Sequence, residues 1–237
     1  MDRLQRMGGT GALVAAATFL IGLALYGTLL LDYTTADTPA EAVAFLLDHT
    51  VPLRIWNLVV TVVFAVAMVP LALALRDRCA ADRATAQIGG IFGIIWAGLL
   101  LATGMITNVG ITAVVDLAAT DPDRATTLWA SLDAVQRGLG GGNEVVGGIW
   151  VLLISTAAWR TGALGRVTNV LGLMAGAAGL LTVVPALMDV GTVFGLGLLV
   201  WYILVGVQLR RPSVLAPSEP LSADAPAPDT RAPGAAV

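Results

Sequence analysis

The sequence predicts an all-α integral membrane protein with six transmembrane helices built as three helical hairpins, with short amphipathic helices on the outer side. Three observations support this fold class. The 237-residue chain is 57% hydrophobic and 12% charged, its apolar residues form six long blocks, and its arginines fall in alternate connecting segments. Blocks of about 20 uncharged residues match the roughly 30 Å hydrocarbon core of a bilayer. So little charge is not typical of a soluble domain.

Each apolar block is long enough to cross the membrane. In chain order, the predicted spans are Gly11–Leu31, Ile55–Leu75, Ile88–Val115, Leu139–Trp159, Val167–Met188 and Val190–Leu209. The first block has a basic start like that of a signal peptide. Its uncharged stretch is longer than the usual apolar region of about 7–15 residues, so we interpret it as a retained span.

The basic residues, all arginines, predict the orientation. With a cytoplasmic N-terminus, the inner segments that adjoin the spans hold nine arginines: Arg3, Arg6, Arg76, Arg78, Arg83, Arg160, Arg166, Arg210 and Arg211. The outer segments hold Arg54, Arg124 and Arg137. Because cytoplasmic loops carry an excess of basic residues, we expect a multi-pass protein of the bacterial cytoplasmic (inner) membrane with both termini cytoplasmic.

One domain is predicted for residues 1–211, with hairpins at about 10–78, 83–160 and 166–211. Residues 212–237 are rich in Pro, Ala, Ser and Asp and have no apolar period. Such a segment cannot bury enough apolar area to offset the entropy of ordering it. We therefore expect a disordered cytoplasmic tail.

The chain contains an internal repeat when it is shifted by 83 residues. The scarce residue types coincide: Pro39 falls on Pro122, Arg54 on Arg137, and Arg83 on Arg166. Both prolines follow a residue that can cap a helix and precede acids, which is typical of a helix start. Each predicted outer helix has an apolar face, formed by Val43, Leu46 and Leu47 in the first and by Leu128, Leu132, Val135 and Leu139 in the second.

Three glycine pairs at a spacing of four lie within the spans: Gly89 and Gly93, Gly172 and Gly176, and Gly191 and Gly195. Small residues on one face let two helices approach closely in a membrane. We interpret all three pairs as packing faces within the chain rather than as a dimer interface.

Glu144 stands out because it follows Gly140–Asn143 and precedes Val145–Trp159, which carry no charge. A carboxylate within the bilayer is costly unless it is paired, protonated or facing water. Six residues at similar depth could line an outward-facing polar cavity with it: Arg54, Arg137, Asn57, Asn108, Asp116 and Asn143. Three interpretations remain open: an ion pair with Arg54 or Arg137, a ligand or proton site, and an interfacial position.

Two stretches carry a resemblance to a known family. The first runs from Arg54-Ile-Trp-Asn57 to Pro70–Leu75, and the second from Gly147-Gly-Ile-Trp150 to Ala158–Arg166. Together they resemble the bacterial multi-spanning membrane proteins of the domain of unknown function 4386, over most of residues 10–210. The resemblance implies this fold and location and brings no activity with it.

No metalloprotease, hydrolase or nucleotide-binding motif occurs in the sequence, so we expect no catalytic residues, no metal and no cofactor. The sequence favours a non-enzymatic module that binds a lipid or small apolar ligand, or an accessory subunit. The alternative is a small secondary transporter with Glu144 as proton or substrate site. The expected partners are membrane lipids, with a small apolar ligand or another membrane protein as further candidates, and no nucleic acid.

Overall fold

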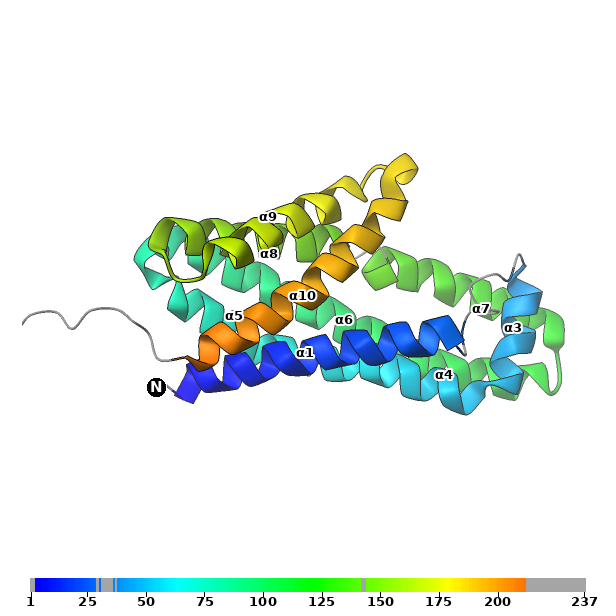
Figure 1. The fold of residues 1–237 in the computed structure, drawn as a ribbon. Helices are drawn as coiled ribbons and strands as arrows, with labels where there is room; N and C mark the ends of the chain where they lie inside the picture. The colour runs from blue at the N-terminus through cyan, green and yellow to red at the C-terminus, as the bar shows by residue number, and fades with distance from the viewer. Residues whose placement is uncertain (1–2, 29, 31–35, 37, 142–143, 212–237) are drawn as a thin grey trace, which may run out of the picture.

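The structure is a computed structural model that describes residues 3–28, 30, 36, 38–141 and 144–211. These residues form helices and no strand (Figure 1). The predicted disordered tail and Asn143 lie outside the described residues. The α-helices are α1 (Arg3–Thr28), α3 (Pro39–Asp48), α4 (Thr50–Asn57), α5 (Phe64–Arg78), α6 (Arg83–Ala118), α7 (Pro122–Gln136), α8 (Glu144–Thr161), α9 (Arg166–Leu181) and α10 (Gly191–Arg210).

Short helices of other types complete the described chain. A π-helix, Leu58–Val63, joins α4 to α5 without a break, and a second one, Arg137–Gly141, continues α7. Two 3-10 helices, Ala80–Asp82 and Pro185–Val190, lie in the connections before α6 and α10. Since π-turns shift the phase of a helix, both π-helices change which side chains face the bundle.

Five helical segments among the described residues are long and apolar enough to cross a membrane, as expected of a membrane protein. The predicted span Val167–Met188 differs from this pattern. Its α-helix, α9, ends at Leu181 after 16 residues. Pro185 has no amide hydrogen and restricts the residue before it, which opposes an extension of α9 through this point. The predicted end of this span was therefore wrong.

The long helices form a closed bundle in which sequence neighbours pack on each other. α1 packs on α5, α5 on α6, α6 on α8, α8 on α9 and α9 on α10, while α10 returns to α1. Close approach depends on glycine at several of these contacts. A β-carbon at Gly148 of α8 would lie 2.7 Å from the carbonyl oxygen of Gly176 in α9. The interpretation of Gly172 and Gly176 as an intrachain packing face is thus confirmed, since a β-carbon at Gly172 would also collide with Ser155 of α8.

Aromatic side chains fill the centre of the bundle. Trp150, Trp201 and Tyr202 are fully buried, and the indole rings of Trp150 and Trp201 are 5.4 Å apart in an edge-on arrangement. The ring of Trp96 lies 5.7 Å from that of Trp150, and the ring of Phe64 lies 5.6 Å from that of Trp96. Such contacts are favourable beyond the area they bury. The bundle is therefore closed by packed rings over this part of its length.

One end of the bundle holds most of the arginines, and we call it the arginine end. It contains the first residues of α1, α6 and α9 and the last residues of α5, α8 and α10. Contacts across these termini tie the end together: Arg160 pairs with Asp82 at 3.2 Å, and Arg210 donates to Thr10 at 2.9 Å. Burial raises the pKa of the nearby Cys79 thiol to about 12, so this lone thiol is protonated.

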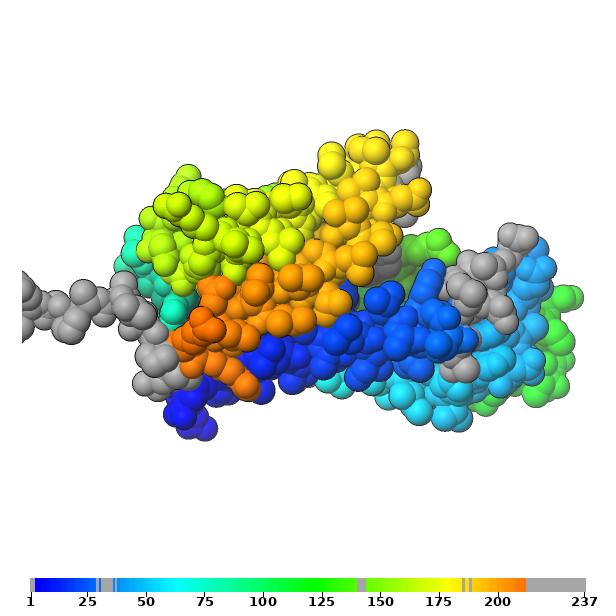
Figure 2. Space-filling view, viewed as in Figure 1, coloured from blue at the N-terminus to red at the C-terminus, as the bar shows by residue number. Residues whose placement is uncertain are grey.

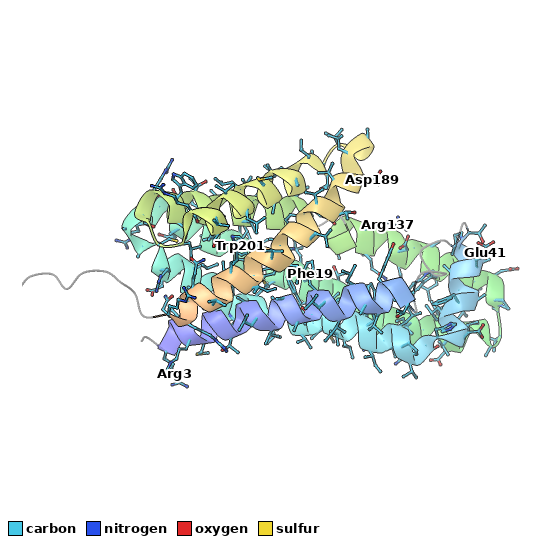
Figure 3. All side chains as sticks on the ribbon, in the orientation of Figure 1. Arg3, Phe19, Glu41, Arg137, Asp189 and Trp201 are labelled. Carbon is cyan, nitrogen blue, oxygen red and sulfur yellow. The ribbon has the colours of Figure 1, made fainter. Side chains whose placement is uncertain are left out.

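The opposite end is built by α3, α4, α7 and the extension of α6 (Figure 1). Helices begin at Pro39 and Pro122 as predicted, and Thr38 and Asp121 cap them through their side chains. A second apolar cluster lies here, formed by Leu30, Val43, Leu46, Leu53, Ile111, Val114, Ala125 and Trp129. Figure 3 shows Arg3 at the arginine end and Glu41, on α3, at this one.

The predicted apolar faces of these two helices are only partly correct. Val43 and Leu46 are buried, whereas Leu47 is 42% exposed. In α7 the buried residues are Ala125 and Trp129, while Val135 is 47% exposed. The predicted residues Leu128 and Leu132 are partly buried and pack on the second apolar cluster, and Leu132 lies against Gly110 of α6. The prediction thus holds for Leu128 and Leu132 and fails for Val135.

Candidate ligand-binding site

The residues predicted to surround Glu144 fall into separate places. Arg54 of α4 donates from Nη2 to the hydroxyl of Thr112 in α6 at 2.8 Å, and Thr112 donates to the carbonyl oxygen of Asn108 at 3.4 Å. Arg54 and Asn108 thus lie near each other, as expected. Among the described residues, Arg54 Nε and the side-chain oxygen of Asn108 are buried without a hydrogen-bond partner. The hydrogen bond from Arg54 to Thr112 links α4 to α6.

Asn57 has a structural contact of its own. It is 3% exposed and donates from Nδ2 to the carbonyl oxygen of Gly104 at 2.9 Å. A buried amide needs such a partner. Asn57 therefore fastens the start of the π-helix to α6.

Arg137 and Asp116 lie on the surface. Arg137 Nε pairs with Asp133, one turn earlier in the same helix, at 2.7 Å, and its side chain is 75% exposed. Asp116 is exposed as well. An exposed pair of this kind contributes little to stability. Figure 3 shows Arg137 after α7, with its side chain among the surface residues.

Glu144 begins α8, where a carboxylate is favourable near the positive end of the helix dipole. It is half-buried and lines a cavity of about 180 Å³ with residues of α1, α5, α6 and α10. A β-carbon at Gly191 would lie 3.7 Å from Oε1 of Glu144. The carboxyl group thus faces the first turn of α10 from the side of the bundle.

No ion pair among the described residues includes Glu144. The interpretation as a bridge to Arg54 or Arg137 is therefore wrong for this structure. Each arginine has another partner: Arg54 donates a hydrogen bond to Thr112, and Arg137 forms an ion pair with Asp133. The π-helix Arg137–Gly141 also intervenes between Arg137 and Glu144, so an α-helical phase does not relate them.

A groove adjoins the Glu144 cavity and opens between α1 and α10. It has a volume of about 400 Å³ and shares Phe19, Val60 and Gly195 with the cavity. Its lining is mostly apolar and aromatic: Thr18, Phe19, Gly22, Leu23, Tyr26, Trp56, Val60, Thr192, Gly195, Leu196 and Leu199. Figure 2 shows α10 resting on α1 near the arginine end and the two helices separating toward the other end.

The walls of this groove follow from the sequence of its three helices. Trp56 donates from its indole nitrogen to the carbonyl oxygen of Gly22 at 3.4 Å, which holds α4 against the back of α1. On the opposite wall, the nearest atom to a β-carbon at Gly195 would be Phe19 Cε1 at 3.7 Å. Leu23 and Leu196 are about half-exposed at the mouth. The groove therefore stays open because glycine at 195 leaves space in front of Phe19.

The sequence did not predict this groove. The polar cavity it predicted is replaced by an apolar groove with one carboxylate at its inner end. Gly195 was interpreted as a packing residue, yet it has no neighbour closer than ordinary van der Waals contact. Glycine spacing alone does not distinguish a helix contact from an open space, so only the placement of Phe19 could have revealed the groove.

Comparison with known proteins found no matching protein family, no similar curated protein and no similar solved structure. The resemblance to the domain of unknown function 4386 stays a prediction.

Proposed function

We propose that this protein is a non-enzymatic membrane module that takes a lipid or small apolar ligand from the bilayer into the groove between α1 and α10. The observation that carries this proposal is a groove of about 400 Å³ with an apolar lining and a mouth between two membrane-length helices. Ligand sites are commonly apolar cavities of about 300–1,000 Å³ with a few placed polar groups. Glu144 is such a group at the inner end.

The proposed setting is the bacterial cytoplasmic membrane, crossed six times with both termini inside. The clustering of arginines at one end supports this orientation, since basic residues favour the cytoplasmic side. The fifth span in chain order is α9, which rises about 24 Å over its 16 residues, and the 3-10 helix before α10 adds length. In this setting the mouth of the groove faces the lipid of the outer leaflet.

Filling the groove tests the proposal. Gly195→Leu places an isobutyl group in the groove, where Phe19 is the neighbour within 4 Å of the β-carbon position. The new side chain should therefore fill the groove without disturbing the helix packing. We expect wild-type protein extracted in a mild non-ionic detergent to retain a lipid or apolar molecule, as measured by native mass spectrometry. Retention by Gly195→Leu is expected to fall at least about tenfold.

Gly98→Leu is the matched control, because Gly98 is exposed on α6 and has no atom within 4 Å of its β-carbon position. It adds the same side chain and is expected to retain the molecule at the wild-type level. Equal retention by wild type and Gly195→Leu would contradict the proposal.

A secondary transporter with Glu144 as proton or substrate site is the second candidate. The observation that favours it is the half-buried carboxyl group in the cavity lined by α1, α5, α6 and α10. The fully buried rings of Trp150, Trp201 and Tyr202 weigh against it, because they fill the bundle between this cavity and the arginine end. Reconstituted vesicles distinguish the two functions: flux that depends on a pH gradient and is lost in Glu144→Gln requires transport, and its absence favours binding alone.

A further inference from the structure

Four aromatic rings stand in series around the Glu144 cavity. Phe19 and Phe64 have ring centres 5.5 Å apart, Phe64 and Trp96 5.6 Å, and Trp96 and Phe194 6.2 Å. All four line the cavity, and they come from α1, α5, α6 and α10. The carboxyl group of Glu144, from α8, lines it too. Rings from four helices and a carboxylate from a fifth thus converge on one space.

This combination of rings and a carboxylate can attract a positive charge. The faces of aromatic rings attract ammonium groups, and rings arranged as a cage recognise methylated ammonium ligands. A carboxylate adds a full opposite charge, whose attraction strengthens as water is excluded. Within the described residues, none of the ion pairs uses the Glu144 carboxylate. A cation could contact both the aromatic rings and the Glu144 carboxylate.

The groove next to the cavity has space for the rest of the ligand. It meets the cavity at Phe19, Val60 and Gly195, so a molecule can occupy both spaces at once. The cavity, at about 180 Å³, is the smaller of the two. A compact head group therefore fits the aromatic end, and a longer apolar tail fits the groove between α1 and α10.

Building on the proposed function, we propose that the ligand is an amphiphilic ammonium cation, with its head group between Glu144 and the four rings and its tail in the groove. An anionic head group would be repelled by Glu144. A neutral tail alone would leave the carboxylate without a partner.

The competing explanation is that Glu144 serves the fold alone. It stands in the first turn of α8 and close to Gly191 at the start of α10, and both positions are favourable for a negative charge. In that case Glu144→Gln would lower the thermal stability without changing which ligands bind. The test therefore measures ligand selectivity beside stability.

The experiment compares two probes on the full-length protein in a non-ionic detergent. One is dodecyltrimethylammonium, and the other is its uncharged isostere, in which a tert-butyl group replaces the ammonium head. Wild-type protein is expected to bind the cation at least about tenfold more tightly by native mass spectrometry. Glu144→Gln is expected to bind both probes alike.

Asp189→Asn is the matched control, since it removes an exposed carboxylate from the turn before α10 (Figure 3). It is expected to keep the wild-type preference. A second variant, Phe194→Leu, keeps every charge and removes one ring of the cage. It is expected to weaken cation binding about fivefold and to spare the neutral probe, so the inference stays testable if Glu144→Gln does not fold.

The outcomes separate this inference from the proposed function. Equal binding of both probes by wild type, with Glu144→Gln and Phe194→Leu unchanged, would overturn the cation inference and leave the apolar groove supported. Binding of neither probe, together with equal lipid retention by wild type and Gly195→Leu, would overturn both.

Discussion

Gly148→Leu is expected to prevent correct folding of the bundle. At this position a β-carbon would lie 2.7 Å from the carbonyl oxygen of Gly176 and 3.0 Å from the amide nitrogen of Leu180. Both are backbone atoms of α9, so they cannot rotate away as a side chain can. Leucine would force α8 and α9 apart along their contact, at a cost of more than about 3 kcal/mol.

Size-exclusion chromatography in mild detergent measures the outcome. We expect the monodisperse fraction of Gly148→Leu to fall several-fold and any folded remainder to melt well below wild type. Gly98→Leu, which adds the same side chain at an open position, is expected to behave like wild type. A normal elution profile and melting temperature for Gly148→Leu would contradict the packing of α8 on α9.

Trp150→Ala is expected to cause the largest loss of stability among truncations in the bundle. The indole is fully buried and contacts the rings of Trp96, Trp201 and Tyr202. Its removal leaves a cavity, because helices held by other contacts can close it only in part. Large-to-small changes at such positions cost about 3–5 kcal/mol.

Thermal unfolding followed by circular dichroism measures this effect, and a decrease in Tm of about 10 °C is expected. Trp159→Ala is the control, because Trp159 lies in the same helix and is 51% exposed. It is expected to lower Tm by no more than a few degrees. Equal shifts for the two variants would show that Trp150 is not at the centre of the packed rings.

The sequence predicted most of the helices because length and polarity determine them. Five long apolar segments and the helix starts at Pro39 and Pro122 were foreseeable from apolar blocks, arginine positions and capping residues. The end of α9 was missed because the apolar block continues to Met188 while the helix ends at Leu181. An apolar block indicates which residues can lie in lipid, but it does not determine where a helix ends.

The candidate site was less predictable than the fold. Glu144 was identified because a lone carboxylate within an apolar stretch is costly, and it does line a cavity in the structure. Its companions were chosen by depth alone, and depth does not determine which helix face a residue occupies. The π-helix before Glu144 changes that face, and Phe19 enters the site from the other end of the chain.

The proposed groove between α1 and α10 would hold a molecule from the membrane. The most direct measurement is an experimental density map of the wild-type protein in native lipid. We expect elongated density between Phe19 and Gly195 that continues to Glu144. Helices α1 and α10 packed together along their whole length, with side chains filling this space, would contradict it.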